Sequence, residues 1–259
     1  MDLGIKGKVA MVAAATRGIG LAAAQSLARE GAKVSICGLD ANRIKEAAAT
    51  LGAPHMAVRC DVASKADIET WFKATTGTLG PPQIIVTNTG GPAAGLIGDL
   101  TEEQWQKGFD NTVLNAVRMV ALASPQMKEA KWGRIVHITS LVAKDPDPVL
   151  SISSTLRAGL GAMSRLQAKE LGPHGITVNC VLPGSTDTDR QTHLLEIRAH
   201  KSGLHIDEER KRAALAVPVR RLAKPEEIGD VIAFLCSERA GYVSGAQIVV
   251  DGAITHGLG

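Results

Sequence analysis

Short apolar runs rich in β-branched residues alternate with longer stretches of helical periodicity along the whole chain. Such runs predict buried strands, and the stretches between them predict helices. Seven strands are predicted, at residues 8–13, 33–37, 55–59, 83–87, 133–139, 175–181 and 246–250. Strands that alternate with helices form right-handed crossovers, which gather parallel strands into one covered sheet. The pattern predicts an α/β fold with a doubly wound, seven-stranded parallel sheet and helices on both faces.

Residues that favour helix starts stand at the beginning of three predicted helices. Ser64 with Asp67, and Thr101 with Gln104, match the pattern in which a hydroxyl and a side chain three residues later cap a helix start. Pro225 suits the first position of a helix near the C-terminus, where its missing N–H is not needed.

One stretch interrupts this alternation. Residues 189–212 are polar and contain His193, His200 and His205, whose irregular spacing predicts no metal site. The stretch forms either two surface helices or a lid over a ligand at the carboxyl edge of the sheet. No repeat, low-complexity tract or flexible linker is present, so residues 1–259 are expected to form a single domain.

Composition and charge exclude several classes of protein. With 259 residues, 45% of them hydrophobic, the chain can bury a large core without a metal or a disulfide. A net charge of +3 and 3% aromatic residues argue against nucleic-acid binding. No apolar run is long enough to cross a membrane, and the first residues lack the features of a signal peptide. We therefore expect a cytoplasmic protein. Its cysteines form no CxxC pair; they are Cys37, Cys60, Cys180 and Cys236.

The segment between the first predicted strand and an Ala-rich helix is built from small residues. It reads Ala14, Ala15, Thr16, Arg17, Gly18, Ile19 and Gly20. Small residues at this junction let the backbone turn tightly and approach a pyrophosphate, which the N–H groups and the positive dipole end of the helix can bind. The segment predicts a dinucleotide site.

This segment resembles the Thr-Gly-x-x-x-Gly-x-Gly pattern of the short-chain dehydrogenase/reductase family, and further matches follow in the family's order. By this resemblance, the pair Asp61 and Val62 contacts adenine, and the segment Asn88, Thr89 and Gly90 flanks the cofactor. Ser140 is the catalytic serine. The motif formed by Pro183, Gly184 and Thr188 holds the nicotinamide side.

The resemblance implies a Rossmann-type fold that binds NAD(P)(H) and transfers hydride between nicotinamide and a small carbonyl or hydroxyl substrate. It also implies a homotetramer. The family contains a subgroup that resembles β-ketoacyl-carrier-protein reductases and has an atypical catalytic tetrad. Two segments of this chain are similar to that subgroup: residues 88–92, and residues 153–158, which include Arg157. That similarity adds acyl thioesters to the expected substrates.

The cofactor segment departs from the family in two places. Ala14 replaces the first glycine, and because alanine favours negative φ, we expect a negative φ there. Gly38 stands where NAD-preferring members carry an acid, although Asp40 follows closely. Arg17 can meet a 2′-phosphate. Together these residues favour NADP(H) over NAD(H).

The catalytic positions depart further. Counting from Ser140, the family's tyrosine and lysine correspond to Ser153 and Arg157, and its asparagine to Thr112. The chain's single tyrosine, Tyr242, matches a packing position in the C-terminal segment.

These replacements change the chemistry. The hydroxyl of Ser153 is a weaker acid than a phenol. Arg157 stays protonated, so it can bind the ribose of the cofactor and stabilise negative charge but cannot donate a proton. Two sources of a proton remain open: a water held by Ser140 and Ser153, or the ammonium of Lys144. A function of another class also remains open, namely a catalytically silent dinucleotide sensor or partner subunit.

Overall fold

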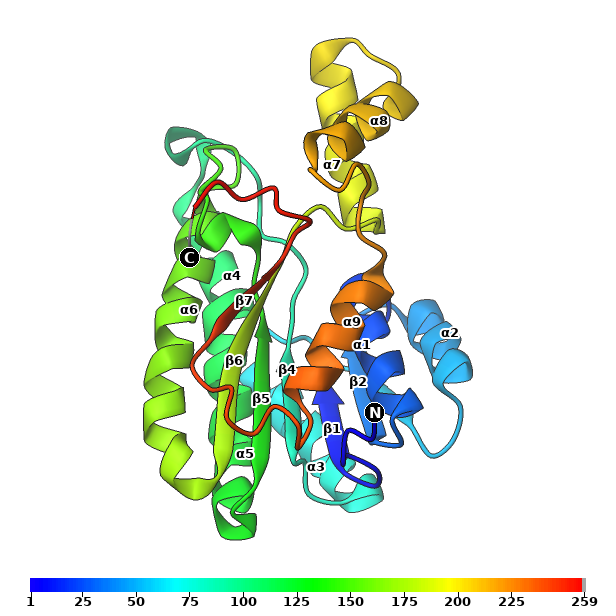
Figure 1. Cartoon of the computed structure of the whole chain (residues 1–259), viewed down its shortest axis with the longest axis vertical. Coiled ribbons are helices and arrows are strands. Elements are labelled where there is room, and N and C mark those ends of the chain that lie inside the picture. The colour runs from blue at the N-terminus through cyan, green and yellow to red at the C-terminus, as the bar shows by residue number, and fades with distance from the viewer. Residues whose placement is uncertain (258–259) are drawn as a thin grey trace.

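The computed structural model describes residues 1–257 and contains one seven-stranded parallel sheet (Figure 1). The strands are β1 (Val9–Val12), β2 (Lys33–Gly38), β3 (Met56–Arg59), β4 (Ile84–Thr87), β5 (Gly133–Ile138), β6 (Ile176–Pro183) and β7 (Gln247–Val250). All seven lie where the hydrophobic pattern predicts them. Every neighbouring pair is parallel, as in the register Val9–Lys33 of β1 and β2.

The strand order is β3-β2-β1-β4-β5-β6-β7. The order reverses direction between β1 and β4, because the chain moves outward from β1 to β3 and then returns to the other side of β1. In open parallel sheets ligands bind at such a switch point, beyond the carboxyl ends of the strands.

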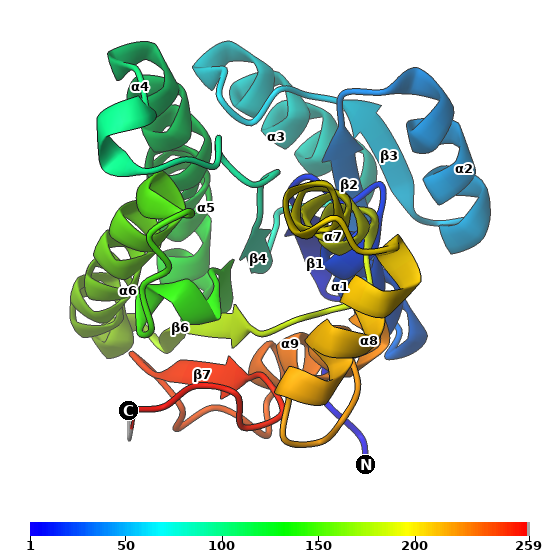
Figure 2. The ribbon, with the colours of Figure 1, turned by 90° about the horizontal axis from the view of Figure 1, so that it is seen from above.

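Helices cover both faces of the sheet. They are α1 (Gly18–Arg29), α2 (Ala41–Leu51), α3 (Lys65–Leu79), α4 (Glu102–Phe109), α5 (Asn115–Ala130), α6 (Ser151–Leu171), α7 (Asp189–Ser202), α8 (Ile206–Ala216) and α9 (Pro225–Leu235). Seen from above, α1, α2 and α9 lie on one face and α3, α5 and α6 on the other (Figure 2). Leu27 and Ile228 belong to the core under the first layer, and Trp71 and Met119 to the core under the second.

The predicted helix starts are confirmed. The Ser64 hydroxyl accepts a hydrogen bond from the Asp67 backbone at the start of α3. Thr101 and Gln104 form a reciprocal capping box at the start of α4. Pro225 is the first residue of α9.

The polar stretch after β6 folds as two helices, α7 and α8, which project beyond the carboxyl edge of the sheet (Figures 1 and 2). The prediction that Tyr242 packs is wrong for the single chain, because its side chain is fully exposed at 103%. The turn around it places the ring outside the core. No helix within residues 1–257 is both long and apolar enough to cross a membrane.

Candidate active site

The start of α1 lacks a side-chain cap that several other helix starts at this edge have. Its N-cap residue, Arg17, forms no side-chain cap, whereas Asp40, Thr101 and Thr188 cap α2, α4 and α7. Helix starts have unpaired N–H groups that need a partner. Within residues 1–257 no hydrogen bond reaches the backbone N–H of Gly18, so this start suits an anion such as a phosphate.

Ala14 adopts φ +45°, so the expectation of a negative φ is wrong. Two contacts hold this left-handed conformation. The Ala14 carbonyl accepts a hydrogen bond from Asn88 Nδ2 at 3.0 Å, and its N–H donates to Cys37 Sγ at 3.4 Å. The loop therefore keeps the shape that glycine adopts easily, at a cost of about 1–2 kcal/mol for a residue with a Cβ.

Gly20 is required by this close approach. A Cβ there would lie 2.7 Å from Asn88 Nδ2 and 2.8 Å from the Ala14 carbonyl oxygen. The backbone oxygen of Asn88 in turn accepts a hydrogen bond from Asn115 at 2.9 Å. Asn88 thus joins the loops after β1 and β4 on the two sides of the switch point.

The predicted adenosine end lies at the tips of β2 and β3. A Cβ at Gly38 would lie 2.6 Å from Thr16 Cγ2, so a larger residue there would displace Thr16. Asp40 accepts a hydrogen bond from the Arg43 backbone and is thereby engaged in capping α2. Asp61 lines a cavity of about 560 Å³ that also includes Leu39. Val62, the other half of the predicted adenine pair, is buried.

The predicted nicotinamide motif, which follows β6, packs against the start of α1. Gly184 packs against Asp251, where a Cβ would lie 2.6 Å from Asp251 Cβ. Thr188 caps α7 through the Gln191 N–H, and its Cγ2 lies 3.3 Å from the position a Gly18 Cβ would take. The predicted pyrophosphate and nicotinamide motifs are therefore adjacent.

Ser140 lies two residues after the end of β5, in extended backbone, and accepts a weak hydrogen bond from the Val142 N–H at 3.4 Å. Ser153 and Arg157 lie one turn apart on α6, and both are buried. The Arg157 side chain reaches the same strand end from the helix side. Its Nη1 donates to the Ile138 carbonyl at 3.1 Å and to the Thr139 carbonyl.

The surroundings of Arg157 lower its pKa. Burial, and then repulsion from Arg190, lowers the pKa of Arg157 to about 10, which leaves the guanidinium protonated at neutral pH. Its Nε and the Thr112 Oγ1 are buried without a hydrogen-bond partner in the described chain. Thr112 lies in a π-helical turn (Asp110–Leu114), and such turns are frequent at functional sites. Lys144, just after the 3-10 helix Leu141–Ala143, is half-buried.

The structure adds three polar residues that the sequence motifs did not identify. Asn115 supports Asn88, and Arg190 lies near Arg157. His137 is buried in β5 between Thr87 and Gln167, and burial lowers its pKa to about 4. A polar residue inside an apolar stripe was the available signal for Asn115 and His137, whereas nothing in the sequence pattern marked Arg190.

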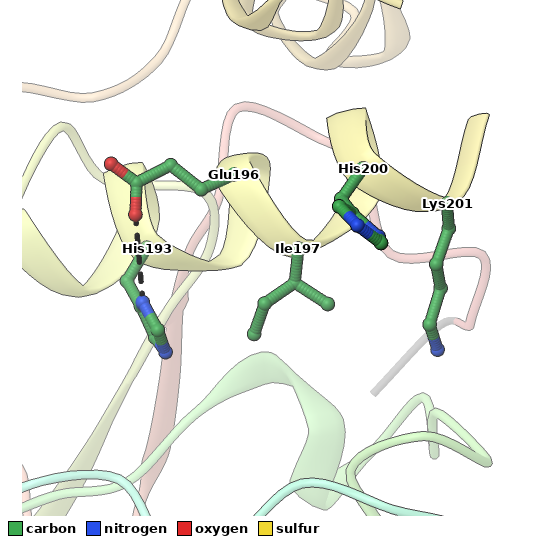
Figure 3. A pocket seen from close by; sticks show the side chains of 5 residues that line it. All are labelled: His193, Glu196, Ile197, His200 and Lys201. Carbon is green, nitrogen blue, oxygen red and sulfur yellow. Dashed lines mark ion pairs between the residues drawn. The ribbon is translucent and has the colours of Figure 1, made fainter. Parts of the chain in front are cut away.

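A pocket lies along one side of α7. It is lined by His193, Glu196, Ile197, His200 and Lys201, and His193 forms an ion pair with Glu196 at 3.6 Å. Figure 3 shows His193, Ile197, His200 and Lys201 pointing from α7 toward the main body. No group of three potential metal ligands occurs anywhere in residues 1–257.

A glycine-lined, uncapped helix start at the switch point of a parallel sheet defines a dinucleotide-binding Rossmann-type protein. The family profile described as enoyl-(acyl carrier protein) reductase matches residues 13–255. The 3-oxoacyl-[acyl-carrier-protein] reductase FabG of Pseudomonas aeruginosa is 34% identical over 97% of this chain and 99% of its own length. Human dehydrogenase/reductase SDR family member 4 is 32% identical, over 95% of this chain and 86% of its own.

Solved structures of reductases have the same fold as this chain. L-sorbose reductase from Gluconobacter frateurii, in complex with NADPH and L-sorbose, superposes with a TM-score of 0.94 at 32% identity over the full length of both chains. An actinorhodin polyketide ketoreductase with NADPH gives 0.93 at 28% identity, over 96% of this chain and 98% of that one. The chain belongs to the short-chain dehydrogenase/reductase family.

Proposed function

We propose that the protein is an NADP(H)-dependent oxidoreductase that acts on a small carbonyl or hydroxyl substrate held beside Ser140. Relatives support this function, because one is named a 3-oxoacyl-[acyl-carrier-protein] reductase and two structural neighbours contain NADPH. Acyl thioesters are among the proposed substrates.

The chain's own residues fit this cofactor. The unpaired N–H groups at the start of α1 suit the pyrophosphate, and the cavity beside Asp61 suits the adenosine end. Asp40 is engaged in capping, Gly38 carries no acid, and Arg17 stands at the helix start, which favours a 2′-phosphate over a 2′-hydroxyl. When bound, NADP(H) supplies or accepts the hydride.

Ser140 and Arg157 have different roles at the end of β5. The Ser140 hydroxyl donates to the substrate oxygen as negative charge develops there. Arg157 fixes the carbonyls directly before Ser140 and adds positive charge, but a pKa of about 10 makes it a poor acid at neutral pH.

The proton comes from a water held by Ser140 and Ser153, or from Lys144. The water route has the stronger support, because Thr112 Oγ1 and Arg157 Nε are buried polar atoms that lack a partner within residues 1–257. Buried polar atoms without a protein partner are commonly satisfied by ordered water.

The observation that carries the proposal is the uncapped start of α1 beside Thr188. Calorimetric titration with NADPH, NADP⁺, NADH and NAD⁺ tests it, followed by absorbance assays with β-keto thioesters, sugar ketones and secondary alcohols. We expect binding that is tightest for NADPH, and turnover of at least one substrate. Absence of binding by all four nucleotides would overturn the proposal.

A second candidate is a catalytically silent dinucleotide sensor or partner subunit. It is favoured by the loss of tyrosine at Ser153 and by the engagement of Arg157 Nη1 with backbone carbonyls. The double variant Ser153→Tyr with Arg157→Lys separates the two candidates. Activity that rises from zero indicates a degenerate site, whereas activity that falls from a measurable level indicates a working site with a different mechanism.

We further propose that α7 and α8 act as a substrate lid within a single domain, because α7 presents a pocket-lining face toward the body. A cytoplasmic homotetramer is proposed as well. Exposed apolar side chains on the long helices, Val117 at 39% and Leu166 at 66%, favour association. Light scattering is expected to give four times the chain mass of 27.1 kDa.

A further inference from the structure

Arg190, in the first turn of α7, reaches across to the loop after β4. Its Nη2 donates to the Pro92 carbonyl at 3.4 Å. A Cβ at Gly91 would lie 2.9 Å from both Nε and Nη2 of Arg190, so the guanidinium covers the backbone at Gly91. The side chain thus contacts the β4 loop at Gly91 and Pro92.

Arg157 approaches the same region from α6. It is nine-tenths buried, with 7% of its surface exposed, and its Nε is buried without a hydrogen-bond partner. Repulsion from Arg190 contributes to lowering the pKa of Arg157.

Within residues 1–257, no carboxylate forms an ion pair with Arg157 or Arg190, and the acids next to Arg190 in sequence pair elsewhere. Asp189 binds Arg17 at 2.8 Å, and Asp187 binds Arg210 at 2.5 Å. Two close positive charges without a counter-charge favour an anionic ligand between or beside them.

We propose that Arg190 binds an oxyanionic group of the substrate, either a carboxylate or a phosphate ester, while Arg157 adds positive potential from behind. This inference rests on the proposed function and names its substrate class: a carbonyl or hydroxyl compound that carries an anion. A planar guanidinium suits both oxyanions because it donates two parallel hydrogen bonds. The dinucleotide phosphates have a separate site, since they are expected at the start of α1 beside Arg17.

The experiment compares matched substrates that differ in charge. Levulinate is set against its methyl ester, and dihydroxyacetone phosphate against dihydroxyacetone. Initial rates of NADPH oxidation give kcat and KM, and calorimetry measures binding of each compound to the protein alone and to its NADP⁺ complex. We expect the anionic member of at least one pair to bind at least about ten-fold more tightly, which corresponds to about 1.4 kcal/mol. The carboxylate and phosphate pairs distinguish the two oxyanions.

Variants assign the effect to Arg190. In Arg190→Gln the preference for the anion disappears through KM, with kcat and NADPH affinity retained; in Arg190→Lys part of the preference survives. Arg198→Gln is the control, because Arg198 is exposed on the same helix. Equal binding of anionic and neutral members by the native chain overturns the proposal, as does a loss of NADPH affinity in Arg190→Gln. Failure of the proposed function is distinct, because it shows as no NADPH binding by the native chain.

Discussion

The two halves of the sheet present different chemistry at one edge. On the β1–β3 side, glycines and the uncapped start of α1 offer mainly backbone groups to the proposed site, and Asn88 from the loop after β4 holds their geometry. On the β5–β6 side, the proposed site depends on side chains, and Ser153 and Arg157 are the residues predicted to replace the family's tyrosine and lysine. Ala14 adopts the left-handed conformation that glycine favours, because contacts from Asn88 and Cys37 hold the loop. A side-chain site changes its chemistry with each replacement.

The largest expected effect is on the side-chain half. Ser140→Ala removes the only hydroxyl proposed to touch the substrate oxygen. Loss of one such donor costs about 10²–10³ in kcat, while NADPH affinity is expected to stay unchanged. Steady-state kinetics and fluorescence titration measure the two. Thr70→Ala, which removes an exposed hydroxyl from α3, serves as the control. An unchanged kcat in Ser140→Ala would contradict the assigned role.

The next effect tests the backbone half. Gly20→Ala places a methyl group against Asn88 and Ala14, and overpacking of this kind costs about 1–3 kcal/mol. We expect NADPH affinity to fall about 10–100-fold in a folded protein. The control is Gly77→Ala on α3, where a Cβ would meet no atom within 4 Å. Equal affinities in both variants would show that the Asn88 contact does not shape the loop.

The buried His137 in β5 is expected to make folding stability depend on pH. Because the pKa of His137 falls from 6.5 to about 4 on folding, its contribution to stability is complete above pH 6.5 and is lost as pH falls toward 4. The linkage amounts to about 2 kcal/mol at pH 5. Urea unfolding at pH 7 and pH 5 is expected to show a smaller difference for His137→Gln than for the native chain. The exposed His174→Gln is the control, and an unaltered pH difference in His137→Gln would refute the assignment.

The smallest effect concerns cofactor choice. Arg17→Ala removes the cation expected at the 2′-phosphate, and loss of one charge-assisted hydrogen bond costs about 1.5 kcal/mol. NADPH affinity should fall about ten-fold, and NADH affinity less than about two-fold. Parallel titrations measure both nucleotides, with Arg198→Ala as the control. An equal loss for both nucleotides would remove Arg17 from the 2′-phosphate site.

Hydrophobic periodicity predicts the fold well here, because each buried strand is a short β-branched run with polar or glycine boundaries. Cap residues predict the starts of α3 and α4 for the same local reason. The φ of Ala14 could not be predicted, since Asn88, far away in sequence, holds it. The exposure of Tyr242 depends on the path of the last loop, and the position of Arg190 depends on how α7 leans over the β4 loop. Such long-range contacts leave no local pattern.

Consecutive residues in the first turn of α7 hold opposite sides of the entrance. Asp189 is bonded to Arg17 on the α1 side, and Arg190 to Pro92 on the β4 side. Only Nη1 of Arg17 is engaged by Asp189, so the other guanidinium N–H groups are free to meet a nucleotide phosphate. One helical turn therefore contacts both the loop that is expected to bind the cofactor and the loop after β4.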